Sequence, residues 1–184
     1  MIGNDIVDLS VARKESNCYR KGFLKKLFTD HEQQLITSSK DSFNLVWRFW
    51  SMKEAAYKIY TQIHHIRFFA PRKFNCIIIS EKEGLVNFKD QFFFTSSILN
   101  KSFISSIASK EKITKAYSKF VKPELIDLTI KKKLAGMTTF PAKKITKKKL
   151  RNGVPFYFHK NTKLTKSCSI SHHGDYGIFS FILI

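Results

Sequence analysis

The alternation of hydrophobic and polar positions divides the first part of the chain into helical segments. From about residue 11 to residue 37 the spacing is helical and basic. Within this range Thr29 is followed three residues later by Glu32, the signature of a capping box at a helix start. A longer helix is predicted from about residue 42 to residue 62.

After Pro71 the periodicity changes to short runs of β-branched and aromatic residues separated by turn residues. This pattern predicts an antiparallel sheet. Its strands are expected within the runs "KFNCIIIS", "GLVNFKD", "QFFFTSSI" and "FISSIAS". The lysine-rich stretch that follows, residues 110–124, fits either a linker between two halves or a solvated helix.

The last third of the chain repeats this plan of a helix followed by strands. A helix is predicted from Pro123 to about residue 134, with Gly136 near its end. Strands are expected in "KKITKKKL", "VPFYF", "SCSIS" and "YGIFSFILI". Gly174 supplies the turn between the last two strands. We assign the remaining polar residues to loops, namely His64, His65, His173 and Asp175.

The length, hydrophobic fraction and net charge of the chain limit the kinds of protein to which it can belong. With 184 residues, of which 43% are hydrophobic, the chain fits one domain or two small halves that share a core. A net charge of +19 indicates a polyanionic partner, which is a nucleic acid, an acidic protein or a phosphorylated small molecule. The lysine-dense residues 131–151 form either a solvated face or an anion-binding surface.

The sequence also indicates where the protein is located and whether its cysteines are reduced. No run approaches the roughly 20 apolar residues of a membrane span. Two early carboxylates occupy the place where a secretory signal needs positive charge. The three cysteines are too widely spaced for a zinc site or a disulfide framework. We therefore expect a soluble, cytoplasmic protein with reduced, structural cysteines and no membrane association.

The stretch "WSMKEAAYK" places Trp50, Glu54 and Lys58 on one face of the predicted helix. The ordinary interpretation is an exposed glutamate–lysine pair that contributes about 0.2–0.5 kcal/mol, with the tryptophan covering the core. Asp5, between apolar neighbours in the opening segment, either faces water at a strand end or lies near a compensating cation, because an unpaired buried charge is costly.

Three separated pieces, taken together, resemble a known family. They are "IGNDIVDL" at the start, "WSMKEAAYK" on the helix, and "NGVPFYF" with "SISHHGDYG" near the end. Together they look like the 4'-phosphopantetheinyl transferase superfamily. The opening is similar to the holo-acyl-carrier-protein synthases, and the helical motif is closer to the larger transferases that activate peptide synthetases.

The resemblance implies roles for individual residues. Asp5 and Glu54 match the acids that bind Mg²⁺, and Glu54 and Lys58 match the catalytic pair. In this family such oxygen ligands suit Mg²⁺, which commonly uses one or two carboxylates with phosphates and water. The positions implied to bind coenzyme A are Lys53, Lys58, Gly153, Pro155, Ser171 and His172.

Two positions depart from the family pattern. Val7 replaces the second acid of the larger transferases, so water is the expected third metal ligand. Val154 stands where a lysine is common beside the nucleotide. The phosphate contact is then expected to have moved to Lys147, Lys148, Lys149 or Arg151.

The resemblance also implies an α/β chain of α+β type, with two similar halves. Each half is expected to be a long helix packed on a small antiparallel sheet, with the active site between the halves. Residues 1–112 would form the metal-binding half and residues 113–184 a shorter nucleotide-binding half. Compared with the larger transferases the halves occur in exchanged order, so one chain can form the whole site as a monomer.

Two functions from different classes remain open at this point. The first is Mg²⁺-dependent transfer of the 4'-phosphopantetheine arm of coenzyme A to a serine of an acidic acyl or peptidyl carrier protein, with release of 3',5'-ADP. The alternative is a basic nucleic-acid-binding module without catalytic activity. No nucleic-acid motif is recognisable, and positive charge also suits an acidic carrier protein.

Overall fold

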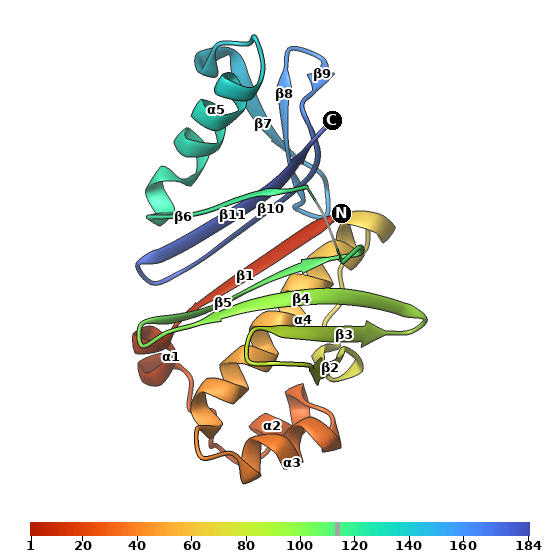
Figure 1. Ribbon diagram of the computed structural model, residues 1–184, viewed down its shortest axis with the longest axis vertical. Coiled ribbons are helices and arrows are strands. Elements are labelled where there is room, and N and C mark those ends of the chain that lie inside the picture. Colours follow the sequence, from red (N-terminus) through yellow and green to blue (C-terminus); the bar gives the residue numbers. More distant parts are fainter. Residues whose placement is uncertain (113–114) are drawn as a thin grey trace.

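Residues 1–112 and 115–184 are described by the computed structural model in Figure 1. Antiparallel sheets with few helices confirm the predicted α+β class. The larger sheet has the strand order β1-β5-β4-β3-β2, and every neighbouring pair is antiparallel. Its strands are β1 (Ile2–Asp8), β2 (Asn75–Ile78), β3 (Glu83–Phe88), β4 (Gln91–Leu99) and β5 (Phe103–Ser109).

One face of this sheet is covered by the long helix α4 (Ser42–His64), as Figure 1 shows. The Asp41 side chain caps the start of the helix by accepting a hydrogen bond from the Asn44 backbone N–H. The helix ends at His64, and the following residue, His65, caps it in a left-handed conformation with φ of 57°. The predicted helix from about residue 42 to 62 is therefore confirmed, although His64 belongs to it rather than to a loop.

Helix α4 and strand β1 touch through their backbones. A Cβ atom on Gly3 would lie 2.0 Å from the Ala55 carbonyl oxygen, a separation that atoms cannot adopt. Only glycine fits at this position, because every other residue would push the strand off the helix. This close approach holds Asp5, two residues along β1, beside the helix turn that carries Glu54 and Lys58.

The helical pattern predicted from about residue 11 to residue 37 corresponds to three short helices. They are α1 (Leu9–Glu15), α2 (Phe23–Leu27) and α3 (Asp30–Ser38). Gly22, with φ of 82°, precedes α2 and breaks the helical path. The predicted capping box between Thr29 and Glu32 is confirmed at the start of α3.

The second part of the chain contains two three-stranded antiparallel sheets, in the orders β10-β11-β6 and β7-β8-β9. Helix α5 (Ile126–Met137), preceded by the 3-10 turn Pro123–Leu125, packs against them. The strands are β6 (Tyr117–Val121), β7 (Ile145–Lys149), β8 (Pro155–His159), β9 (Thr162–Lys163), β10 (Thr165–His173) and β11 (Tyr176–Leu183).

Strand β6 was not predicted, because its stretch of sequence reads as a linker or a solvated helix. It is an edge strand whose ring of Tyr117 packs on the rings of Phe179 and Phe181, while the middle of the strand is exposed. The two ends of the strand, Tyr117 and Val121, pack on the second hydrophobic cluster, and a short edge strand of this kind gives little hydrophobic alternation. The predicted boundary between the two halves falls between residues 112 and 113, and residues 113 and 114 lie outside the described part of the chain.

The buried side chains form two hydrophobic clusters. One contains residues of β1, α4 and the five-stranded sheet, and the other lies between α5 and the sheets of the second part. Helix α5 has 12 residues against the 23 of α4, and its strands belong to two sheets. The similarity of the two halves therefore stays a prediction.

Strands β1 and β10 lie side by side, joined by side chains instead of a backbone ladder. The N–H groups of Ile2, Asn4 and Asp8 donate to Ser167 Oγ, Ser169 Oγ and His173 Nδ1 respectively, each at 2.9 Å. Each pair is separated by the same 165 residues, so the strands run in the same direction. His173 thus ends a strand and does not lie in a loop, and polar side chains of β10 satisfy the free edge of β1.

The three cysteines are free and buried, as the sequence predicts. Among the described residues, no helix combines the length and the apolar character that crossing a membrane requires.

Candidate active site

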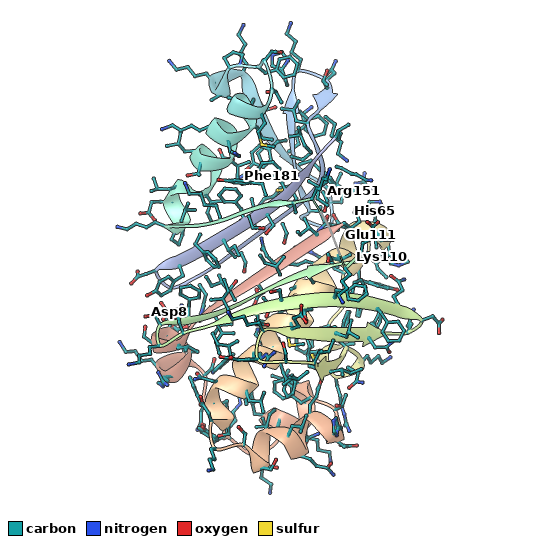
Figure 2. All side chains as sticks on the ribbon, in the orientation of Figure 1. Asp8, His65, Lys110, Glu111, Arg151 and Phe181 are labelled. Atoms are coloured by element: carbon teal, nitrogen blue, oxygen red, sulfur yellow. The ribbon has the colours of Figure 1, made fainter. Side chains whose placement is uncertain are left out.

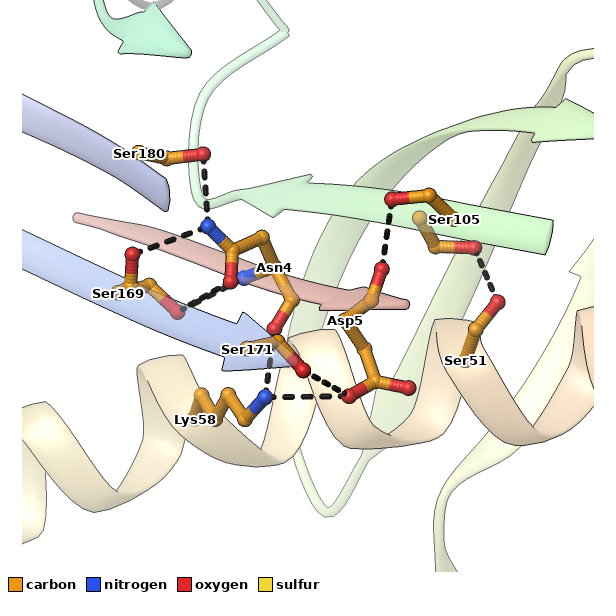
Figure 3. A network of polar contacts seen from close by, with 9 residues as sticks. Asn4, Asp5, Ser51, Lys58, Ser105, Ser169, Ser171 and Ser180 are labelled. Atoms are coloured by element: carbon orange, nitrogen blue, oxygen red, sulfur yellow. Dashed lines mark hydrogen bonds and ion pairs between the residues drawn. The ribbon is translucent and has the colours of Figure 1, made fainter. Parts of the chain in front are cut away.

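Asp5 and Lys58 form an ion pair where β1 meets α4. Lys58 Nζ lies 3.1 Å from Asp5 Oδ1 and donates a second hydrogen bond to the Asn4 carbonyl oxygen at 2.8 Å, as Figure 3 shows. Ser171, on β10, donates to the same Asp5 oxygen at 2.8 Å. The compensating cation predicted for Asp5 is therefore Lys58, and the ordinary Glu54–Lys58 pair along the helix is not formed.

Glu54 is left without a partner beside this pair. Within residues 1–112 and 115–184, no hydrogen bond or ion pair reaches its carboxylate. Burial, and secondarily the nearby Asp5 carboxylate, raise the pKa of Glu54 to about 7, while Lys58 opposes the shift. Two neighbouring carboxylates, of which only Asp5 contacts an ammonium, favour a further cation at this place.

Glu54 lines three cavities, and two of them also reach residues of the second part of the chain. The first, here called the aromatic cavity, has a volume of about 420 Å³. The second, here called the turn cavity, has a volume of about 250 Å³ and lies between the last turns of α4 and the loop before β8. Glu54 lines both, so a molecule in either cavity can reach the same carboxylate.

The aromatic cavity combines rings, polar groups and cations. Its far wall carries Arg20 and Lys26, from the basic region around α2. Its other lining side chains that matter here are Asp5, Phe23, Trp47, Trp50, Phe69, Ser171 and His172. His172 is exposed, whereas Ser171 is buried.

The turn cavity is shaped by the residues before β8. Asn152 donates to the Thr61 carbonyl oxygen at 2.8 Å, which fixes the turn against α4. Gly153 has φ of 81°, and a Cβ atom there would lie 2.5 Å from an Arg67 guanidinium nitrogen. Gly153 therefore serves both the positive φ and the close approach of Arg67.

The structure brings together most of the positions that the sequence predicts. Asp5, Glu54, Lys58, Ser171 and His172 lie around one place, although they come from β1, α4 and β10. Gly153 and Pro155 line the turn cavity together with Lys58.

Lys53 does not join this group. Its ammonium lies 2.7 Å from Glu32 Oε2 and donates to the carbonyl oxygens of Pro71 and Phe74. Both members of the ion pair are at most 1% exposed. All three donors of its ammonium are used inside the protein, so none is free for coenzyme A, although the residue lines the third cavity beside Glu54.

Two lysines of β7 also contact residues outside the candidate site. Lys147 lies 3.4 Å from Asp127 Oδ1, and Lys148 lies over the Phe158 ring. Neither of these residues, nor Lys149 or Arg151, lines the turn cavity. Sequence reasoning missed Arg67, which follows the end of α4 and belongs to no pattern. It also noted Arg20 and Lys26 only as part of a basic helix.

Two carboxylates are the acidic groups available for a metal ion at this place. Among the residues that the structure describes, no group of three or more His, Cys, Asp or Glu side chains could hold one. Two carboxylates still fit Mg²⁺, which completes its shell with water and substrate phosphates. The buried Glu54 carboxyl group, which has no hydrogen-bond or ion-pair partner among the described residues and lies near Asp5, is the observation that favours a cation there.

The sequence was also compared with known protein families. A family model described as "4'-phosphopantetheinyl transferase superfamily" matches residues 1–119 of the chain. This range includes Asp5, Glu54 and Lys58. A search of curated proteins returned no match.

Proposed function

Because the chain belongs to the 4'-phosphopantetheinyl transferase superfamily, we propose that it moves the 4'-phosphopantetheine arm of coenzyme A to a serine of an acyl or peptidyl carrier protein. The reaction would depend on Mg²⁺ and release 3',5'-ADP, as in the holo-acyl-carrier-protein synthases. The observation that carries the proposal is the meeting of Asp5, Glu54 and Lys58 with Ser171 between two cavities.

Asp5 and Glu54 would hold the Mg²⁺ ion. When bound, the ion would neutralise charge on the diphosphate of coenzyme A. Lys58 keeps the Asp5 carboxylate in place at 3.1 Å, and Ser171 fixes the same oxygen from the opposite strand. Asp5 thus enters the reaction already oriented, which limits the reorganisation needed during transfer.

Glu54 is the proposed base. The carrier serine must lose a proton as its oxygen attacks phosphorus, and Glu54 has no hydrogen-bond donor among the described residues to compete for its lone pairs. Its position on both cavities lets it face a serine from one side and a phosphate from the other. Lys58 would stabilise the negative charge that develops on the phosphate and on the leaving 3',5'-ADP.

The two cavities suit the two substrates. The turn cavity carries Lys58 and Arg67, which fit the phosphates of coenzyme A. The aromatic cavity would receive the carrier serine, and Arg20 and Lys26 on its wall would attract an acidic carrier surface. Residues from both parts of one chain contribute, which agrees with a monomer.

The direct test is transfer itself. The protein is incubated with coenzyme A, Mg²⁺ and a panel of apo carrier proteins, and mass spectrometry detects the added arm. We expect modification of a carrier serine that stops when EDTA is added. No transfer to any carrier, together with tight and salt-sensitive RNA binding, would instead favour the nucleic-acid-binding alternative.

A further inference from the structure

We infer that Arg67 binds the 3'-phosphate of coenzyme A and sets the preference for the 3'-phosphorylated donor. The inference rests on the proposed function, because it assigns one contact within the proposed donor site. Arg67 takes the place of the lysines of β7 and of Arg151, which the sequence analysis suggested for this phosphate contact. Arg67 would be a specificity-determining residue that does not act on the reacting atoms.

The absence of a side chain at Gly153 leaves room for Arg67. Its guanidinium occupies the space where a side chain at residue 153 would begin, with a nitrogen 2.5 Å from the ideal Cβ position. The turn itself is fixed to α4 by the hydrogen bond from Asn152 to the Thr61 carbonyl oxygen. Figure 2 labels His65 and Arg151, which mark the place where the end of α4 and this turn come together.

Arg67 is free to bind an anion. The side chain is exposed, and no carboxylate or carbonyl in residues 1–112 and 115–184 pairs with it. The competing cations are either engaged or outside the cavity, since Lys147 pairs with Asp127 and Arg151 does not line it. A planar guanidinium with two free edges matches a phosphate monoester, which it binds through paired N–H donors.

The separation of Arg67 from Lys58 distinguishes the two anionic groups of the donor. Lys58 lies at the metal end of the turn cavity, beside Asp5, and is placed for the diphosphate. Arg67 lies beyond the end of α4, which is six residues past Lys58, or about 9 Å along the helix axis. In coenzyme A the 3'-phosphate and the diphosphate lie on different sides of the ribose, so two separated cations suit them.

The experiment compares two donors and two arginines. Initial rates of transfer are measured with coenzyme A and with 3'-dephospho-coenzyme A, for the wild type, Arg67→Gln and the control Arg151→Gln. Arg67→Gln should raise KM for coenzyme A by about 10–100-fold, the range of one charge-assisted contact, and leave KM for the dephosphorylated donor and both kcat values unchanged. Arg151→Gln should behave as the wild type with both donors.

Equal losses with both donors would assign Arg67 to the diphosphate or to the turn and overturn the inference. Loss of discrimination in Arg151→Gln in place of Arg67→Gln would overturn it as well. Calorimetric titration of 3',5'-ADP against 5'-AMP gives the same answer without transfer, so it decides even if no carrier is modified. The wild type should bind 3',5'-ADP more tightly than 5'-AMP, and Arg67→Gln should lose that difference; if the wild type binds both equally, the inference is wrong.

Discussion

Helix α4 carries two lysine–carboxylate pairs five residues apart, and they differ in what surrounds them. The Lys53–Glu32 pair is at most 1% exposed, and the remaining donors of the lysine go to backbone carbonyl groups. The Lys58–Asp5 pair has 26% and 11% of its side chains exposed and opens on the two cavities. The first pair is complete within the protein, whereas the second leaves room for a ligand.

The difference shows how one helix can serve both the core and the site. Glu32 also accepts hydrogen bonds from the N–H groups of Thr29 and Cys76, so it ties α3, α4 and β2 together. Asp5 is held by two donors, and the neighbouring Glu54 has none among the described residues. Groups whose partners are all supplied by the protein stabilise the fold, and groups left short of partners are available for chemistry.

Breaking the buried pair should give the largest effect on stability. Glu32→Gln leaves the Lys53 ammonium charged and uncompensated, which costs about 3–5 kcal/mol. In a chain of this length the melting temperature should fall by roughly 6–20 °C. Calorimetry checks this. The double variant Glu32→Gln/Lys53→Met, which lacks the stranded ammonium, should regain part of the loss; a single variant as stable as wild type would mean that the pair is not structural.

Glu54 should weaken the metal-free fold at high pH. Because folding raises its pKa from 4.5 to about 7, the protonated carboxyl favours the folded state, and this contribution is lost as pH rises through 7. In EDTA, Glu54→Gln should have a higher unfolding free energy than the wild type. This difference between the two proteins should be about 2–3 kcal/mol larger at pH 8 than at pH 5. Urea unfolding at both pH values measures it, and a gain independent of pH would contradict the buried carboxylate pair.

Removing Lys58 should cost the least stability. Lys58→Met breaks a pair whose lysine is 26% exposed but whose carboxylate is largely buried, so the unfolding free energy should fall by about 1–3 kcal/mol, less than for Glu32→Gln. Transfer should fall strongly, because the charge near the phosphate is gone. Measured beside Glu32→Gln, this variant sharpens the contrast. A stability loss as large as that of Glu32→Gln would make the two pairs equivalent.

The sequence predicts elements whose pattern is local. The capping box at Thr29, the long helix, and the strands between residues 75 and 109 follow from periodicity and turn residues, and they are found as expected. Strand β6 was missed because it is a short edge strand whose middle is exposed and whose packed side chains, Tyr117 and Val121, stand at its two ends.

The site residues that belong to recognisable sequence motifs could be predicted. Asp5, Glu54, Lys58 and Ser171 lie together as the resemblance implies. Lys53 and Lys58 look alike in sequence, and nothing local indicates that Glu32 from another helix closes over the first. Arg67, the second cation of the turn cavity, lies against Gly153, which is 86 residues away in sequence, and this contact cannot be inferred from either position alone.

The central claim is that Glu54 acts in the reaction and does not support the fold. The measurement is turnover of Glu54→Gln at saturating Mg²⁺, beside its thermal unfolding, with the exposed Glu124→Gln as a control. Helix propensity is nearly the same for Gln and Glu, so the helix should persist. We expect turnover to fall by about 10²–10⁴-fold while the protein remains folded and the control keeps wild-type activity. A folded Glu54→Gln protein that transfers the arm at the wild-type rate would remove Glu54 from the site and leave the mechanism without its base.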